Sequence, residues 1–392
     1  MNLIAVSPLR TVTSVFAAIA LGALLSSCGE REKIADGSEP ANSTDSSPTL
    51  TILTWDEYFS EEVVKAFEKE HGIEVKFETF TNLDEMEAML RSRPANFDLI
   101  LTSSGKAADL IALELVQPIQ KDLIPLFGNL DERFLGLNGD PGNEHSVPYM
   151  WGPTLIAYRS DKISEPEKSW KSLWDERYRG HVLMLDETFD TYGAALLALG
   201  YDINTQDPKH LEEATKLLLD QVERLDTRFV NIFEVRDKLL SGDCWITMTY
   251  SSDAAVLAEK EENISYFIPG EGASLWLDSF VIPRESTRAD TAHLFLDYFC
   301  RPEVAAENSN ELWSASANRA VRPFISKEIL DDSTIYLSDE VLARCHVEGQ
   351  SSPERQLTIN QGFKRLFDLV REAEDTSKVG LNSPAEEDDT EK

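Results

Sequence analysis

The stretch that begins at residue 50 alternates between strand and helix patterns. Residues 50–54 (LTILT) are short and rich in β-formers, and residues 61–71 carry one apolar stripe of helical spacing. Residues 73–78 alternate apolar and charged side chains, which is typical of a strand with one buried face. A second helical stretch, 83–93, precedes residues 97–101 (FDLIL), which are apolar enough for a strand buried on both faces. This order predicts a doubly wound α/β lobe.

The ends of the first and third predicted strands carry polar and aromatic side chains. Trp55, Asp56 and Tyr58 follow the first strand, and Ser103 follows the third. In open α/β sheets, ligands bind beyond the carboxyl ends of the strands. These residues are therefore candidate binding residues by position as well as by chemical type.

An aromatic ring and a carboxylate fall close together four times along the chain: Trp55-Asp56 with Tyr58, Asp190 with Tyr192, Tyr250 with Asp253, and Trp276 with Asp278. The face of a ring attracts a cation, and a carboxylate accepts hydrogen bonds from its N–H groups. Trp276 and Asp278 are two apart on a predicted strand and share one face, whereas Glu187 and Asp190 are three apart and neighbours on a helix. Buried carboxylates without partners are costly, so a cluster of them predicts a bound organic cation.

The charge balance excludes one class of partner. The chain has 37 basic and 70 acidic residues and a formal charge of −33. Nucleic-acid binding needs a basic footprint, and none is visible. An acidic field concentrates cations near the protein, although solubility alone explains the acidity equally well.

The two ends of the chain differ from its middle. An apolar run, 12–25, follows Arg10 and is shorter than the roughly 20 residues that a membrane-spanning helix needs. It ends in Leu-Ser-Ser-Cys28, which resembles a bacterial lipobox, so we expect residues 1–27 to be a lipoprotein signal peptide and Cys28 to be lipidated; an ordinary secretory signal is the alternative. Polar composition predicts a flexible tether over 28–48 and an acidic disordered tail over 372–392.

The remaining cysteines predict no special chemistry. Cys244, Cys300 and Cys345 allow one disulfide at most. Cys345 and His346 are adjacent, but no further cysteine or histidine stands at zinc-ligand spacing. We expect neither a metal nor a cofactor.

Five segments carry a resemblance to a known family. The chain resembles the spermidine/putrescine-binding proteins of polyamine ABC transporters in order from about residue 50 to about residue 370, in the segments 50–72, 97–103, 147–157, 169–180 and 275–283. The resemblance implies the two-lobed type II periplasmic-binding-protein fold, in which each lobe is a doubly wound sheet flanked by helices and crossover strands join the lobes. It places the N-lobe at 49–153 plus 277–322 and the C-lobe at 154–276 plus 323–371.

The resemblance also implies a set of ligand-binding residues. Trp55, Tyr58 and Ser103 match family positions in the first lobe, and Glu187 and Asp190 match two acids at the start of a C-lobe helix. Tyr250 stands where the family has a tryptophan, Asp253 matches an acid of the putrescine-type members, Trp276 and Asp278 match the inter-lobe strand, and Trp313 stands where a tyrosine is usual. Asp56 replaces a Ser or Thr and joins the candidates, whereas Tyr192 is assigned to packing. Lys106 follows the loop serine where an aromatic is usual, and it would repel an ammonium if it pointed inward.

The implied function is that of a monomeric, lipid-anchored periplasmic receptor. It would capture putrescine or spermidine between its lobes and deliver it to an ABC-transporter permease. Two alternatives stay open: the same fold with another organic cation or a small peptide as ligand, and a hydrolase that uses a pair of acids. The six histidines are scattered, and the chain has no GxSxG, HExxH or P-loop motif, so we do not expect an enzyme.

Overall fold

The strands follow one another in a single hydrogen-bonded path. In the computed structural model, which describes residues 48–137 and 139–381, the order is β2-β1-β3-β10-β5-β8-β6-β7. These strands are β1 (Thr49–Thr54), β2 (Glu74–Thr79), β3 (Leu99–Ser103), β5 (Ser146–Arg159), β6 (Val182–Leu185), β7 (Arg228–Val230), β8 (Ile246–Tyr250) and β10 (Ser274–Pro283). Four shorter strands pair outside this path: β4 (Val116–Gln117) and β12 (His346–Val347) with β10, and β9 (Ile264–Phe267) and β11 (Ala315–Ser316) with β5.

The first lobe has the predicted strand and helix order. β1 pairs in parallel with β2 and β3, and α1 (Glu61–His71), α2 (Leu83–Ser92) and α3 (Ser104–Ala112) follow the three strands in turn. The Ser60 hydroxyl accepts from the N–H of Val63 and begins α1, and Gly72 ends it with a left-handed φ of 67°.

The third strand lies two residues later than the pattern predicts. A 3-10 turn at Pro94–Asn96 delays its start. Asp98 precedes the strand as a buried anchor, because its carboxylate accepts from the N–H of Thr51 and pairs with Arg288. The sequence predicted that Phe97 and Asp98 belong to the strand, because they are part of the apolar run. The run gives no indication of the contacts that Asp98 makes.

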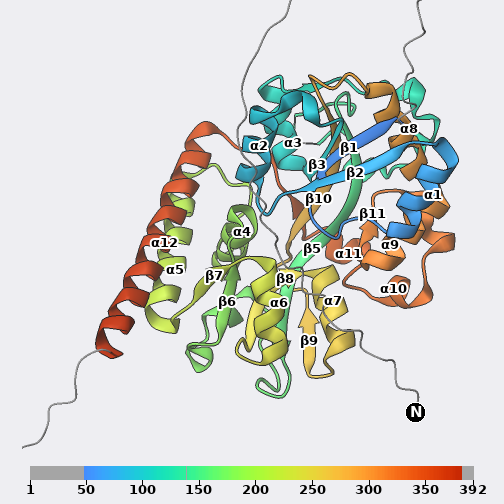
Figure 1. The fold of residues 1–392 in the computed structure, drawn as a ribbon. Helices are drawn as coiled ribbons and strands as arrows, with labels where there is room; N and C mark the ends of the chain where they lie inside the picture. The colour runs from blue at the N-terminus through green and yellow to red at the C-terminus, as the bar shows by residue number, and fades with distance from the viewer. Residues whose placement is uncertain (1–47, 138, 382–392) are drawn as a thin grey trace, which may run out of the picture. The chain divides into compact units, whose positions relative to one another are not determined.

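Two long strands connect the first group of elements to the second. β5 pairs with β10 over its first half, and with β8 and β9 over its second half. β10 in turn pairs with β3 of the first group. Figure 1 shows β5 and β10 running from the elements around β1 to those around β6 and β8. The two-lobed α/β fold is confirmed, whereas the lobe boundaries 49–153 plus 277–322 and 154–276 plus 323–371 stay a prediction.

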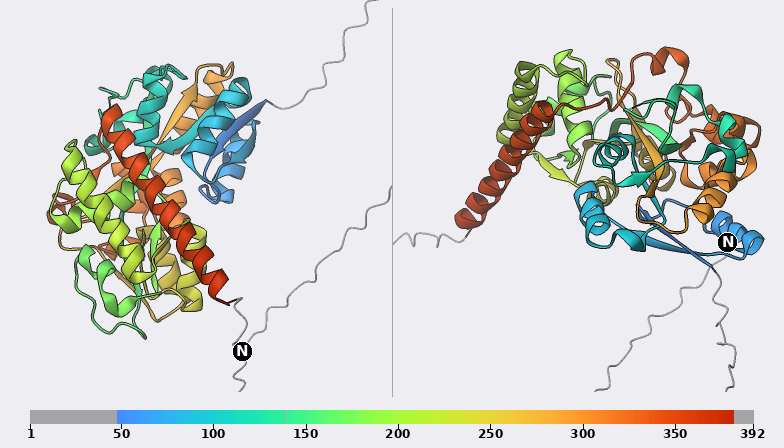
Figure 2. Two further views of the ribbon diagram at one scale, coloured as in Figure 1. Left: turned by 90° about the vertical axis from the view of Figure 1, so that its left-hand side faces the viewer. Right: turned by 90° about the horizontal axis from the view of Figure 1, so that it is seen from above.

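The second lobe is built around the parallel strands β6, β7 and β8. Its helices are α4 (Thr188–Leu199), α5 (Pro208–Leu225), α6 (Ile232–Ser241) and α7 (Ser251–Lys260). α12 (Pro353–Leu381) packs along α5, side by side with it in the views of Figures 1 and 2. The predicted disordered tail over 372–392 is therefore wrong for 372–381, which continue a helix, and 382–392 lie outside the described residues.

The other helices are α8 (Ala289–Phe299), α9 (Pro302–Leu312), α10 (Lys327–Asp331) and α11 (Asp339–Leu342). Within residues 48–137 and 139–381, no helix is long and apolar enough to cross a membrane. The predicted signal peptide, its Cys28 and the tether up to residue 47 lie outside the described residues. Cys244, Cys300 and Cys345 are all buried and free.

Candidate ligand-binding site

Asp278 lies at the centre of the candidate set, on the strand that joins the lobes. It stands opposite Ser103 of β3, at a bulge in the pairing of β10 with β5. A bulge re-aims the side chain that it carries. The Tyr58 hydroxyl donates to Oδ2 of Asp278 at 2.6 Å. Burial raises the pKa of Asp278 to about 6, the hydrogen bond from Tyr58 opposes this, and the charge of Asp190 adds to it.

Ser103 and Lys106 both belong to the start of α3. The Ser103 hydroxyl accepts from the N–H of Lys106 at 3.2 Å and caps the helix. The Lys106 ammonium forms an ion pair with Glu87 of α2, and its side chain is 11% exposed. This cation is therefore already compensated within the first lobe.

Asp190 is held by both long strands. It lies in the first turn of α4 and is 7% exposed. Its Oδ1 accepts from Thr154 Oγ1 of β5 at 2.5 Å and from Ser274 Oγ of β10 at 2.6 Å. Burial raises the pKa of this carboxyl, and the two hydroxyl donors oppose the shift. Both partners are neutral, so the charge of Asp190 is stabilised but not cancelled.

Glu187 stands at the N-cap position of α4 but does not cap the helix with its side chain. It is half-buried. Burial, followed by the charges of Asp190 and Asp186, raises the pKa of Glu187 to about 8.

Tyr250 lies among four of the candidate acids. It ends β8, and its ring meets Trp276 edge-on, with centroids 6.3 Å apart and planes at 77°. Burial raises the pKa of the Tyr250 phenol well above its usual value, and four carboxylates add to the shift: Asp190, Glu187, Asp253 and Asp278. Acids from α4, α7 and β10 thus converge on one ring, as the sequence pattern predicts.

The indole of Trp276 packs directly against the backbone of Gly152. A Cβ built on Gly152 would lie 2.6 Å from Cζ2 of the Trp276 indole, which is closer than real contacts. The indole Nε1 of Trp276 is buried and has no hydrogen-bond partner. A buried N–H without a partner is costly, so this donor is suited to a ligand or to water.

Asp253 is the candidate acid with a cation of its own. Nε of Arg236 on α6 donates to its Oδ1, and the Asp253 side chain is 6% exposed. Burial raises the pKa of the Asp253 carboxyl, and the Arg236 charge opposes this. Arg236 also approaches Glu57, which follows β1, at 3.7 Å.

Three of the predicted site residues lie away from the central acids Asp190 and Asp278. Trp55 is half-buried and packs on Phe80, with centroids 4.3 Å apart. Asp56 is exposed and accepts from the neighbouring N–H of Glu57. Trp313 ends α9 in the left-handed region with φ 50° and packs against the core of the second lobe. The structure brings none of these three into contact with Asp190 or Asp278. Tyr192 is fully buried and bonded to Thr215, as its assignment to packing predicts.

Glu348 is the acid that the sequence reasoning missed. It follows β12, and its carboxylate lies so close to Gly105 of α3 that a Cβ there would be 2.1 Å from Oε2. Burial and the charge of Asp190 raise the pKa of Glu348 to about 7, and Arg355 and Lys106 oppose the shift. No periodic pattern surrounds this residue, so only the pairing of β12 with β10 reveals its place.

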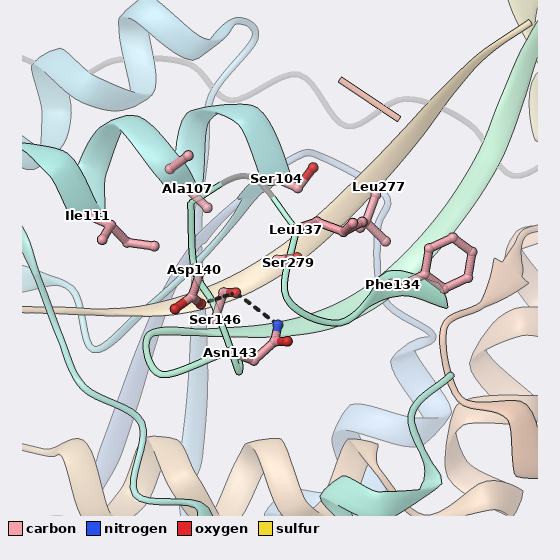
Figure 3. Close-up of a pocket in the computed structure, with 11 residues that line it drawn as sticks. Ser104, Ala107, Ile111, Phe134, Leu137, Asp140, Asn143, Ser146, Leu277 and Ser279 are labelled. Carbon is pink, nitrogen blue, oxygen red and sulfur yellow. Dashed lines mark hydrogen bonds between the residues drawn. The ribbon is translucent and has the colours of Figure 1, made fainter. Parts of the chain in front are cut away.

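A hollow behind β10 is distinct from this site. Figure 3 shows Leu277 and Ser279 of β10 facing it. Trp276 and Asp278 alternate with these two residues along the strand and therefore lie on its opposite face. Its polar wall is satisfied internally, because the Asp140 carboxylate accepts from Ser146 Oγ at 2.7 Å. We therefore assign the hollow to the packing of the fold and not to ligand binding. Among the described residues, no group of three or more His, Cys, Asp or Glu side chains could hold a metal ion.

The arrangement suits an organic cation. Rings and buried carboxylates lie together in it, and burial raises the pKa values of its acids, with repulsion from neighbouring carboxylates adding to the rise at Glu187, Asp278 and Glu348. A cation that entered would relieve this repulsion.

Comparison with known proteins identifies the family of the chain. Residues 62–333 match the model of the family described as bacterial extracellular solute-binding protein. The spermidine/putrescine-binding periplasmic protein of Escherichia coli K12 is 30% identical over 304 residues, which cover 76% of this chain and 86% of the relative. The putrescine-binding periplasmic protein PotF of the same organism is 31% identical over 316 residues, covering 76% and 85%.

A solved structure has the same fold. The spermidine/putrescine ABC transporter substrate-binding protein PotD of Streptococcus pneumoniae superposes with a TM-score of 0.74 at 26% identity, covering 83% of this chain and 100% of that one. These matches confirm the family resemblance seen in the sequence. The chain belongs to the bacterial extracellular solute-binding proteins.

Proposed function

We propose that this protein captures a polyamine, putrescine or spermidine, between its two lobes and delivers it to the permease of an ABC transporter. One observation carries the proposal. Asp190 and Asp278 are both 7% exposed, and their partners are the hydroxyls of Thr154, Ser274 and Tyr58. Within the described part of the chain, no cation is among the groups that shift the pKa of either carboxyl.

The chemistry of a polyamine matches this arrangement. Its ammonium groups need anionic acceptors, and its methylenes need an apolar wall. In the proposed complex, Asp278 and the acids Glu187 and Asp190 accept the ammonium groups, while the rings of Tyr250 and Trp276 cover the methylenes. Ser103, Trp55, Tyr58, Asp56 and Trp313 complete the proposed set, and Glu348 joins it on the structure. Asp253, which the sequence also predicts, is paired with Arg236 and is left out of the proposed ligand contacts. A bound ammonium replaces repulsion between the carboxylates with attraction. It is therefore bound most strongly where carboxylates repel one another in the ligand-free protein.

The strands that form the site also connect the lobes. Thr154 and Ser274 lie on β5 and β10, and both donate to Asp190 of α4. A ligand that bound Asp190 and Asp278 together would therefore favour the closed arrangement of the lobes. We expect the mature protein to be a periplasmic monomer, anchored to a membrane through the lipid on Cys28.

Equilibrium binding tests the proposal. Isothermal titration calorimetry on the chain from Pro48 onward should show saturable binding of putrescine or spermidine, with spermine and cadaverine as further ligands. A neutral diol of the same length as putrescine is the matched control, and it should not bind because it lacks the ammonium groups. Absence of binding to all four amines, or equal binding of the diol, would contradict the proposal. Glycoside turnover, measured alongside, would support the hydrolase alternative instead.

A further inference from the structure

Arg236 gives one candidate acid an internal counter-ion. It lies on α6, and its Nε donates to Oδ1 of Asp253 in the first turn of α7. Its guanidinium lies over the ring of Phe233, 5.3 Å from the centroid, which helps to hold it in place. Asp253 thus makes a charge-assisted bond within its own lobe.

The two acids that Arg236 reaches are not equivalent. Glu57 lies 3.7 Å away, and its side chain is 75% exposed, so this contact contributes little. The Asp253 side chain is 6% exposed and accepts directly from Nε. Removing one partner of such a pair leaves an uncompensated charge in a poorly solvated place. Arg236 therefore acts as the counter-ion of Asp253 rather than as a bridge to the first lobe.

This pair distinguishes Asp253 from Asp190 and Asp278 among the acids around Tyr250. Asp190 and Asp278 have hydroxyl partners, which leave their negative charge in place. Asp253 has a guanidinium, which cancels its charge. A cationic ligand is consequently attracted to Asp190 and Asp278, and it meets a positive side chain at Asp253.

We propose that Arg236 is a specificity-determining residue, which keeps ligand ammonium groups away from Asp253 and thereby favours a short diamine over a longer polyamine with an additional ammonium. This proposal rests on the proposed function, because it assumes a cationic ligand. Like charges brought together disfavour the wrong partner, so Arg236 limits how many ammonium groups the site accepts.

A double-mutant cycle tests the assignment. In Asp253→Asn, Arg236 loses its counter-ion, so the affinity for putrescine and spermidine should fall by roughly tenfold or more. In Arg236→Gln, the affinity for spermidine should rise relative to that for putrescine by about fivefold or more, because Asp253 becomes available and the repulsion is gone. The double variant carries no charge at either position and should bind both ligands within about threefold of the wild type.

Arg228→Gln is the matched control. Arg228 lies in the same lobe and pairs with Glu234, and the two side chains are 42% and 39% exposed. Its replacement should change neither affinity nor selectivity. Thermal unfolding of each ligand-free variant identifies any that fails to fold. If Arg236→Gln is such a variant, Asp253→Asn and the double variant carry the test, since the double variant buries no unpaired charge.

The possible outcomes separate the two proposals. If the double variant keeps the full loss of Asp253→Asn, Asp253 binds the ligand itself and the assignment is overturned. An unchanged ratio of spermidine to putrescine affinity in Arg236→Gln also overturns it. If the wild type binds no amine, the proposed function fails, and this assignment fails with it.

Discussion

Ligand binding should release protons near neutral pH. The pKa is raised to about 8 for Glu187, about 7 for Glu348 and about 6 for Asp278, in each case mainly by burial. At pH 7 these values leave Glu187 about nine-tenths protonated, Glu348 about half and Asp278 about a tenth. These three acids of the ligand-free site therefore hold about one and a half protons between them. An ammonium favours the ionised form of each acid and expels them.

The sign of the pH dependence follows. A polyamine remains charged at pH 7, because the pKa of an alkyl ammonium is about 10. The protons must then come from the protein, and binding becomes tighter as pH rises from about 6 to about 8. Near pH 7 the logarithm of the association constant should rise by about one to one and a half per pH unit.

Calorimetry in two buffers measures this release. Titrations at pH 7 in phosphate and in Tris, whose ionisation enthalpies differ, give the number of protons from the difference in observed heat. Glu187→Gln should reduce that number by about nine-tenths of a proton, whereas Glu354→Gln, an exposed acid on α12, should leave it unchanged. Equal heats in the two buffers, or the same release from Glu187→Gln as from the wild type, would refute the reasoning.

Three further predictions concern affinity, packing and stability. Asp278→Asn should weaken polyamine binding by about 2 kcal/mol or more in calorimetry, because a buried charge-assisted bond is lost; unchanged affinity would remove Asp278 from the site. Gly152→Ala should displace the Trp276 indole and weaken binding, while Gly193→Ala, whose Cβ would meet nothing closer than 3.8 Å, should not, and equal affinities of the two variants would contradict the role of Gly152. The free energy of unfolding of the ligand-free protein, measured with denaturant, should fall as pH rises from about 5 to about 8, because the native state binds protons at Glu187 and Glu348 that the unfolded chain releases; a rise over that range would contradict this.

Local patterns predicted the first lobe well. Ser60 and Gly72 mark the two ends of α1 in the sequence and do so in the structure. The order of strands and helices follows from periodicity alone, since each element buries one face. The shift of β3 by two residues depends on the anchor at Asp98, whose partners Thr51 and Arg288 are distant in sequence. Such long-range pairing has no local signal.

The candidate site was predictable where chemistry and position coincide. Tyr58, Asp190, Tyr250, Trp276 and Asp278 stand out because ring and acid recur together at strand ends and at a crossover, and the structure brings them together. Their ligand contacts stay a prediction. Thr154 and Ser274, the hydroxyl partners of Asp190, were not predicted, because a threonine or serine in a strand is ordinary.

Two charged residues near the site could not be predicted from the sequence. Arg236 looks like any arginine on the polar face of a helix, and only the adjacent α7 makes it a counter-ion. Glu348 stands in an irregular segment that reaches the site through the two-residue strand β12. Both depend on how helices and strands pack, which a single sequence does not encode locally.

The partners of the acids explain how the site combines affinity with reversibility. A hydroxyl donor orients a carboxylate without cancelling its charge, so Asp190 and Asp278 remain attractive to a cation. A guanidinium in the same place would occupy the acid permanently, as Arg236 occupies Asp253. The protons on Glu187 and Glu348 are a third arrangement, because they neutralise charge in the ligand-free state and leave when an ammonium arrives. Protonation therefore lowers the repulsion between the acids of the empty site, and the need to remove these protons on binding lowers the net affinity, which favours release of the ligand.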